Sequence, residues 1–87
     1  MTYRVDVEAR AARQIRRLPR GIQERVTLAA YALGSDPRPH GYDKLAGRDN
    51  EYRIRVGDYR IVYAIHDDVL VVMVIEVGPR DQIYRRR

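Results

Sequence analysis

The sequence predicts an α+β domain in which a helical hairpin packs on one face of a mainly antiparallel sheet. Three observations predict this fold. Apolar residues alternate at the N-terminus and change to helical spacing from Glu8 onward. Two tight-turn signals then divide the last third of the chain into three apolar strands. At 87 residues the chain has room for one core, so a single domain is expected over residues 1–87.

The N-terminal half is expected to supply one strand and two helices. Residues 2–7 alternate, with Tyr3, Val5 and Val7 on one face. Two apolar series with helical spacing follow, first Ala11, Ile15, Leu18 and Ile22, then Ile22, Val26, Ala29, Ala30 and Leu33. Pro19 separates the two helices and suits the first turn of the second.

The C-terminal half is expected to form a loop and then three strands. Glycine, proline and polar residues mark the loop at 34–41, and residues 42–50 are less regular. The expected strands are residues 52–56, 59–66 and 69–77, joined by the turns Gly57-Asp58 and Asp67-Asp68 and ended by Gly78-Pro79. The last strand is a continuous apolar run, as in a central strand covered on both faces. The element order is therefore β-α-α-β-β-β, with a short C-terminal segment.

The composition limits the possible functions. The net charge is +5, and all but one of the 17 lysines and arginines are arginines, which favours an anionic partner such as RNA. Cysteine is absent, so disulfides and thiolate metal sites are excluded, and we expect neither a metal nor a cofactor. No apolar run reaches the ~18–20 residues of a membrane span, and no signal-peptide pattern opens the chain. We therefore expect a cytoplasmic protein with no membrane partner.

Four arginines lie at the starts and ends of the apolar strands. Strand alternation places Arg53 and Arg55 on one face of the sheet, and the hairpin brings Arg60 to the same face. Arg80 follows the last strand and reaches this face if it sits beside these strands. Guanidinium groups gathered in this way bind a phosphate backbone. Spacing alone leaves open the alternative that they are solvated arginines on an uncovered sheet face.

The chain resembles the RelE toxins of the RelE/ParE superfamily, which belong to bacterial toxin–antitoxin pairs. The resemblance rests on the segments RRLP, KLAG, GDYRIVYAI and VGPRDQIY. It implies a RelE-like fold and a metal-independent endoribonuclease that cuts messenger RNA in the ribosomal A site. In that reaction the 2′-hydroxyl attacks the neighbouring phosphate, giving a 2′,3′-cyclic phosphate and a free 5′-hydroxyl. The implied partners are the ribosome, messenger RNA and a small acidic RelB-like antitoxin that blocks the arginines or displaces the Tyr84 segment.

The resemblance also implies roles for particular residues. Arg60 of GDYRIVY matches an arginine that binds the scissile phosphate, and Arg80 matches one that stabilises charge or assists the leaving group. Tyr84 matches a tyrosine that stacks on or orients the substrate. The resemblance further implies three RNA-binding residues, Arg53, Arg55 and the lone lysine, Lys44. The best-known family member carries lysines at the positions of Arg53 and Arg55.

That difference bears on the general base, because a lysine with a lowered pKa can accept the 2′-hydroxyl proton and an arginine cannot. Tyr84, His40 or His66 could act instead, or the site could work by positioning and electrostatic stabilisation. We favour the last option and expect slow or strictly ribosome-dependent cleavage. The alternative functions are a ParE-like poison of DNA gyrase and a ribosome- or RNA-binding protein of weak or lost catalytic activity.

Overall fold

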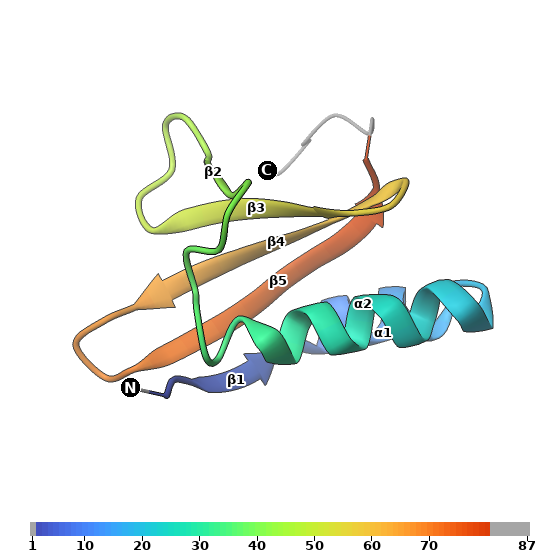
Figure 1. Cartoon of the computed structure of the whole chain (residues 1–87), viewed down its shortest axis with the longest axis horizontal. Coiled ribbons are helices and arrows are strands. Elements are labelled where there is room, and N and C mark those ends of the chain that lie inside the picture. The colour runs from blue at the N-terminus through green and yellow to red at the C-terminus, as the bar shows by residue number, and fades with distance from the viewer. Residues whose placement is uncertain (1, 81–87) are drawn as a thin grey trace.

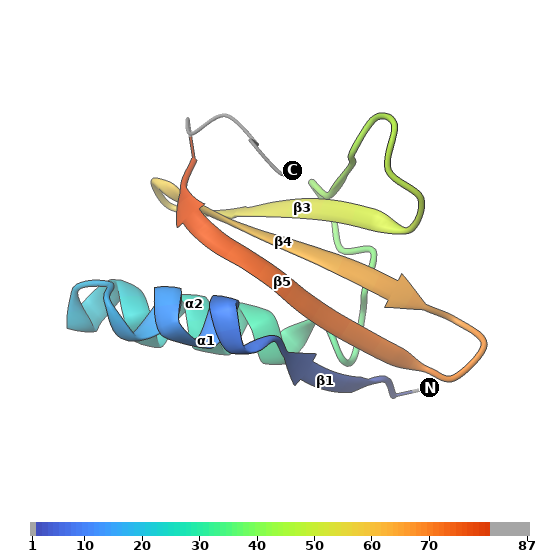
Figure 2. The ribbon, with the colours of Figure 1, turned by 180° about the vertical axis from the view of Figure 1, so that it is seen from behind.

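Two helices pack on one face of a mixed sheet (Figures 1 and 2). The structure, a computed structural model, describes residues 2–80. Its elements are β1 (Arg4–Val7), α1 (Ala9–Arg16), α2 (Arg20–Ala32), β2 (Asp43–Lys44), β3 (Glu51–Val56), β4 (Tyr59–His66) and β5 (Val71–Pro79). The strand order is β1-β5-β4-β3-β2. Between residues 2 and 80, β1 and β5 form the only parallel pair, so the predicted fold class is confirmed.

The core lies between the helices and the sheet face that they cover. Alternate residues of β3 and β4 enter it, including Ile54, Ile61 and Tyr63, because successive strand side chains point to opposite faces. Val26 and Leu33 meet them from α2 and from its C-terminal end. Strand β5 is buried at every position except Met73 and Pro79. This burial explains its uninterrupted apolar sequence.

Several boundaries differ from the sequence prediction. Pro19 caps α2 from outside the helix, and α1 already ends at Arg16. Strand β5 begins at Val71, because the two preceding residues belong to the turn, where Leu70 has a positive φ of 55°. The two-residue strand β2 was not predicted, since it has no alternation to detect.

A β-bulge changes which face the end of β5 presents. Val62 pairs with Glu76, whereas the next residue of β4, Tyr63, pairs with Val74. Ile75 is therefore the extra residue. In a regular strand the core face of Val72 and Val74 would continue at residue 76, but here it continues at Val77. Glu76 is thus turned to the opposite face, where Arg60 lies.

The loop after α2 is held against the sheet by polar contacts. The buried Tyr63 hydroxyl donates a hydrogen bond to the Pro37 carbonyl over 2.8 Å. The Arg38 guanidinium lies over the Tyr52 ring and pairs with Asp67 at 2.9 Å. These contacts connect the loop to β3, β4 and the β4–β5 turn.

We expect the Asp67 contacts to make stability depend on acid pH. Hydrogen bonds from Arg38 and from the Tyr3 hydroxyl hold the pKa of the Asp67 carboxyl below its usual value. Because the pKa is lower in the folded chain, the contact stabilises the fold above the ordinary carboxyl pKa, near ~4, and is lost as pH falls through the folded pKa. Thermal unfolding should therefore be less sensitive to acid in Asp67→Asn than in wild type. Asp68→Asn, in the same exposed turn, is the control; equal acid sensitivity in all three proteins would contradict the expectation.

Candidate nucleic-acid interface

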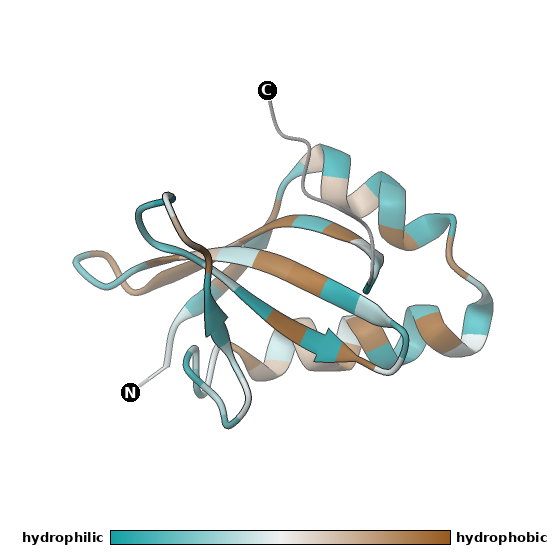
Figure 3. Ribbon diagram, turned by 90° about the horizontal axis from the view of Figure 1, so that it is seen from above, coloured by the Kyte–Doolittle hydropathy of each residue, from teal (hydrophilic) through white to brown (hydrophobic). Residues whose placement is uncertain are grey.

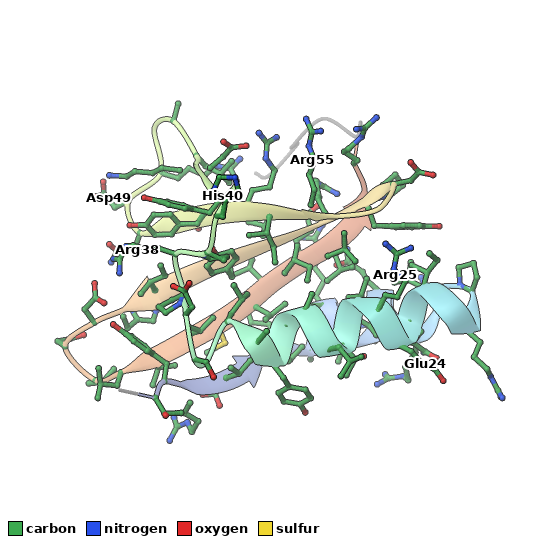
Figure 4. All side chains as sticks on the ribbon, in the orientation of Figure 1. Glu24, Arg25, Arg38, His40, Asp49 and Arg55 are labelled. Atoms are coloured by element: carbon green, nitrogen blue, oxygen red, sulfur yellow. The ribbon has the colours of Figure 1, made fainter. Side chains whose placement is uncertain are left out.

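The sheet face opposite the helices carries three of the four predicted strand arginines. Arg55 is the register partner of Arg60, and Arg53 is the partner of Val62, so all three share one face, as predicted. Figure 4 shows Arg55 pointing away from the helices, and Figure 3 shows hydrophilic and hydrophobic residues alternating along the strands. We call the surface formed by Arg53, Arg55, Arg60 and Arg80 the arginine face.

Arg80 lies at the end of the arginine face nearest the β3–β4 turn. Its backbone N–H donates a hydrogen bond to the Asp58 carbonyl over 2.8 Å. Strand pairing places Arg60 opposite Gly78, two residues before Arg80. Because the β3–β4 hairpin and the end of β5 meet here, Arg55, Arg60 and Arg80 gather at one end of the sheet.

The four arginines differ in their exposure. Arg55 and Arg80 are exposed and can meet a ligand directly. Arg53 is partly buried, and its Nη2 pairs with Asp43 Oδ2 of β2 at 2.7 Å. Arg60 has no exposed surface. Strand alternation correctly predicted the shared face but not these differences.

Arg60 forms the floor of the arginine face. Its Nη1 donates to the Pro79 carbonyl over 2.9 Å, and its Nη2 donates to Glu76 Oε2 over 3.1 Å. The Nη2 of Arg10, on α1, lies 3.9 Å from the same carboxylate oxygen. Glu76 thus lies between two guanidinium groups, which stabilises its charge where little water reaches it. Strand alternation does not predict this contact, because a regular β5 without the bulge would have placed Glu76 on the core face of the sheet.

The structure separates other predicted residues from the arginine face. Lys44 pairs in register with Tyr52, a core residue, so its position faces the helix side of the sheet. His66 is six residues from Arg60 along β4, which is about 20 Å in a strand. Tyr84 lies outside the described residues.

A groove of about 700 Å³ lies between the C-terminal half of α2, the following loop and β3. Its lining includes Leu33 and Ile54 as apolar floor, with His40 and Arg55 among the polar groups. Figure 4 shows His40 in the loop in front of β3. His40 and Arg55 therefore line the same groove. No sequence pattern predicts this groove, because its walls come from segments far apart in the chain.

Neither a metal site nor a membrane span is found in the part of the chain that the structure describes. Within residues 2–80, no three His, Cys, Asp or Glu side chains are grouped so that they could hold a metal ion. Of the two helices in the same range, neither is long and apolar enough to cross a membrane.

Comparison with known proteins shows to which family the chain belongs. The family model described as the ParE toxin of the type II toxin–antitoxin system, parDE, matches residues 5–84. The mRNA interferase toxin RelE of Escherichia coli is 32% identical over 84 residues, covering 94% of this chain and 87% of the relative. The toxin RelE of Mycobacterium tuberculosis is 36% identical over 88 residues, covering 95% of this chain and 87% of the relative.

A solved structure agrees with the sequence matches. The toxin in the archaeal RelE–RelB complex from Pyrococcus horikoshii superposes with a TM-score of 0.82 at 28% identity, covering 95% of this chain and 100% of that chain. The sheet order and the helical hairpin are therefore shared along nearly the whole chain. Together these matches show that the chain belongs to the ParE toxin family of type II toxin–antitoxin systems and, within it, to the RelE toxins.

Proposed function

We propose that this chain is the toxin of a type II toxin–antitoxin pair and acts as an mRNA interferase that cuts messenger RNA in the ribosomal A site. The observation that carries the proposal is the arginine face, with Arg55 and Arg80 exposed beside the buried Arg60. Guanidinium groups gathered on one surface bind a phosphate backbone through charge-assisted hydrogen bonds. A relative at 32% identity is named as an mRNA interferase, which supports the same assignment.

In the proposed reaction the 2′-hydroxyl of the message attacks the adjacent phosphorus. The hydroxyl loses its proton, the bond to the 5′ oxygen breaks, and that oxygen takes up a proton as it leaves. The products are a 2′,3′-cyclic phosphate and a 5′-hydroxyl. Arg55 and Arg53 hold the RNA backbone. Arg60 binds the scissile phosphate, which reaches its guanidinium once the docking of RNA uncovers a side chain that has no exposed surface in the free chain. Arg80 stabilises the charge on the leaving oxygen, and Tyr84 orients the nucleotide.

Catalysis in this scheme depends on positioning and electrostatic stabilisation. No side chain on the described part of the arginine face is a good base at neutral pH, since a guanidinium keeps its proton. Correct in-line alignment of the 2′-hydroxyl with the phosphate, together with positive charge placed beside the developing oxyanion, can lower the barrier by several kcal/mol without a base. We propose that the ribosome provides this alignment, so that free RNA is cut slowly or not at all.

The proposed partners follow from the same surface. A RelB-like antitoxin of acidic character would cover the arginine face and prevent RNA from binding. The archaeal RelE neighbour was solved with RelB, which supports an antitoxin of that kind. The ribosome and its message are the proposed substrate complex, and this places the working protein in the cytoplasm.

We expect Arg80→Ala to lower ribosome-dependent cleavage by about 10- to 100-fold, since a charge-assisted hydrogen bond contributes ~1.5–3 kcal/mol. Primer extension on a message paused on purified ribosomes would measure the cut at each codon. Arg4→Ala is the matched control, because it removes the same charge from an exposed residue of β1 that pairs with Val71, at the opposite end of β5 from Arg80. Equal activity in the Arg80 and Arg4 variants would contradict the role of Arg80.

A second function, poisoning of DNA gyrase, is favoured only by the ParE name of the matching family model. Assays of message cleavage, DNA supercoiling and ribosome binding on the same purified chain distinguish the three functions. Cuts phased to the A-site codon support the mRNA interferase. An uncut message together with inhibited DNA supercoiling would support the gyrase poison. Ribosome binding without either effect would support a catalytically weak RNA-binding protein.

A further inference from the structure

Glu76 is a buried carboxylate on the same sheet face as Arg60. Only 9% of its side-chain surface is exposed. Its Oε2 accepts a hydrogen bond from Arg60, and its Oε1 has no hydrogen-bond partner within residues 2–80. A buried carboxylate is costly unless a nearby cation stabilises it, so the position of Glu76 and that of Arg60 depend on each other.

The charge on Glu76 also allows the arginines to stand close together. Arg55 and Arg60 are direct register partners, and like charges directly opposite each other on two strands repel. Glu76 offsets the charge of Arg60. The exposed Arg55 can therefore lie across from Arg60 without an uncompensated pair of cations.

The contacts of Arg60 fix the plane of its guanidinium. Among these contacts, one is to the Glu76 carboxylate and another is to the Pro79 backbone, so the group is held at these points along β5. Helix α1 supports the same stretch of β5, because Gln14 Oε1 accepts a hydrogen bond from the Val77 N–H over 2.7 Å. A guanidinium held in this way loses little further freedom when it binds a phosphate.

We propose that Glu76 is a positioning residue of the nuclease, which acts by holding Arg60 in the orientation that receives the scissile phosphate. The inference rests on the proposed mRNA interferase function and adds a residue to it. Glu76 does not touch RNA in this scheme, and its effect passes through Arg60 alone.

Substitution of Glu76 should lower turnover more than substrate binding. In Glu76→Ala we expect kcat for A-site cleavage to fall about tenfold, with KM for the programmed ribosome changed less than about twofold, because misplacement of a catalytic group mainly affects the transition state. Glu76→Gln keeps an oxygen that accepts the hydrogen bond and should lose only about threefold. An equal rise in KM for both variants, with kcat unchanged, would overturn the proposal.

Gln14→Ala provides the matched structural control. It removes a contact between α1 and β5 next to Glu76 but leaves the hydrogen bonds of Arg60 to Glu76 and Pro79 in place. If Gln14→Ala lowers kcat as much as Glu76→Ala does, Glu76 has only a structural role and the proposal fails.

A measurement without RNA tests the same contact independently of activity. In NMR spectra of the purified chain, the guanidinium protons of Arg60 should exchange slowly with water in wild type and in Gln14→Ala. They should exchange at least about tenfold faster in Glu76→Ala, since the carboxylate that holds them is gone. Unchanged exchange would refute the positioning role. A wild-type chain that cuts no message would refute the nuclease, even if this exchange result is as expected.

Discussion

Replacement of Arg60 by alanine should lower the free energy of unfolding by about 3–5 kcal/mol, because it leaves a buried carboxylate without its main partner. Among the described residues, Glu76 would then retain only Arg10 as a cationic partner, whose Nη2 is 3.9 Å away on a side chain that is 55% exposed. Urea unfolding followed by circular dichroism would measure the loss. Ribosome-dependent cleavage should fall as well, so activity has to be compared at a temperature where both proteins are folded.

Two further variants make the stability result specific to the buried pair. The exposed Arg55→Ala should change stability by no more than about 0.5 kcal/mol. The double variant Arg60→Ala/Glu76→Ala should be more stable than Arg60→Ala alone, because the buried Glu76 carboxylate is no longer left without its partner. If Arg60→Ala proves as stable as Arg55→Ala, or if the double variant is the least stable of the three, Glu76 does not depend on Arg60.

The shared face of the arginines could be predicted because the register of β3 and β4 is set locally. The two-residue turn at Gly57-Asp58 fixes which residues pair, and alternation then places Arg53, Arg55 and Arg60 on the same side. The turn glycine has a φ of +60°, a conformation that glycine adopts easily. Short-range sequence information was therefore enough for this part of the site.

The burial of Arg60 could not be predicted, because it depends on a bulge in a strand that the sequence does not mark. Residues 71–75 are all apolar, and any of them could be the extra residue without changing the pattern. Alternation alone would have sent Glu76 into the core. The sheet face on which Lys44 lies could not be predicted either, because it depends on a strand of only two residues.

Among the described arginines, Arg55 is the position where a lysine should restore a general base. We expect Arg55→Lys to raise the rate of A-site cleavage by about 10- to 100-fold, because a well-placed general base contributes ~10²–10⁴-fold. Arg55 lies across from Arg60 and at the same end of the sheet as Arg80. A lysine there would have the cation of Arg80 at the same end of the sheet and would lose water when the ribosome covers the face. Both effects lower the pKa of an ammonium group, so that some of it is neutral near pH 7.

Arg53→Lys is the matched control, because it makes the same substitution two residues away on the same face. The Asp43 carboxylate that now pairs with Arg53 at 2.7 Å would stay beside the new lysine and favour its protonated form. We therefore expect Arg53→Lys to leave the cleavage rate within about threefold of wild type. Single-turnover cleavage measured from pH 6 to pH 9 distinguishes the two variants, and the gain in Arg55→Lys should grow with pH as the ammonium loses its proton. A pH-independent gain, or the same gain in both variants, would mean that lysine improves RNA positioning and not proton transfer. No gain in either variant would mean that the ribosome already supplies the proton acceptor for the 2′-hydroxyl that the arginine face lacks.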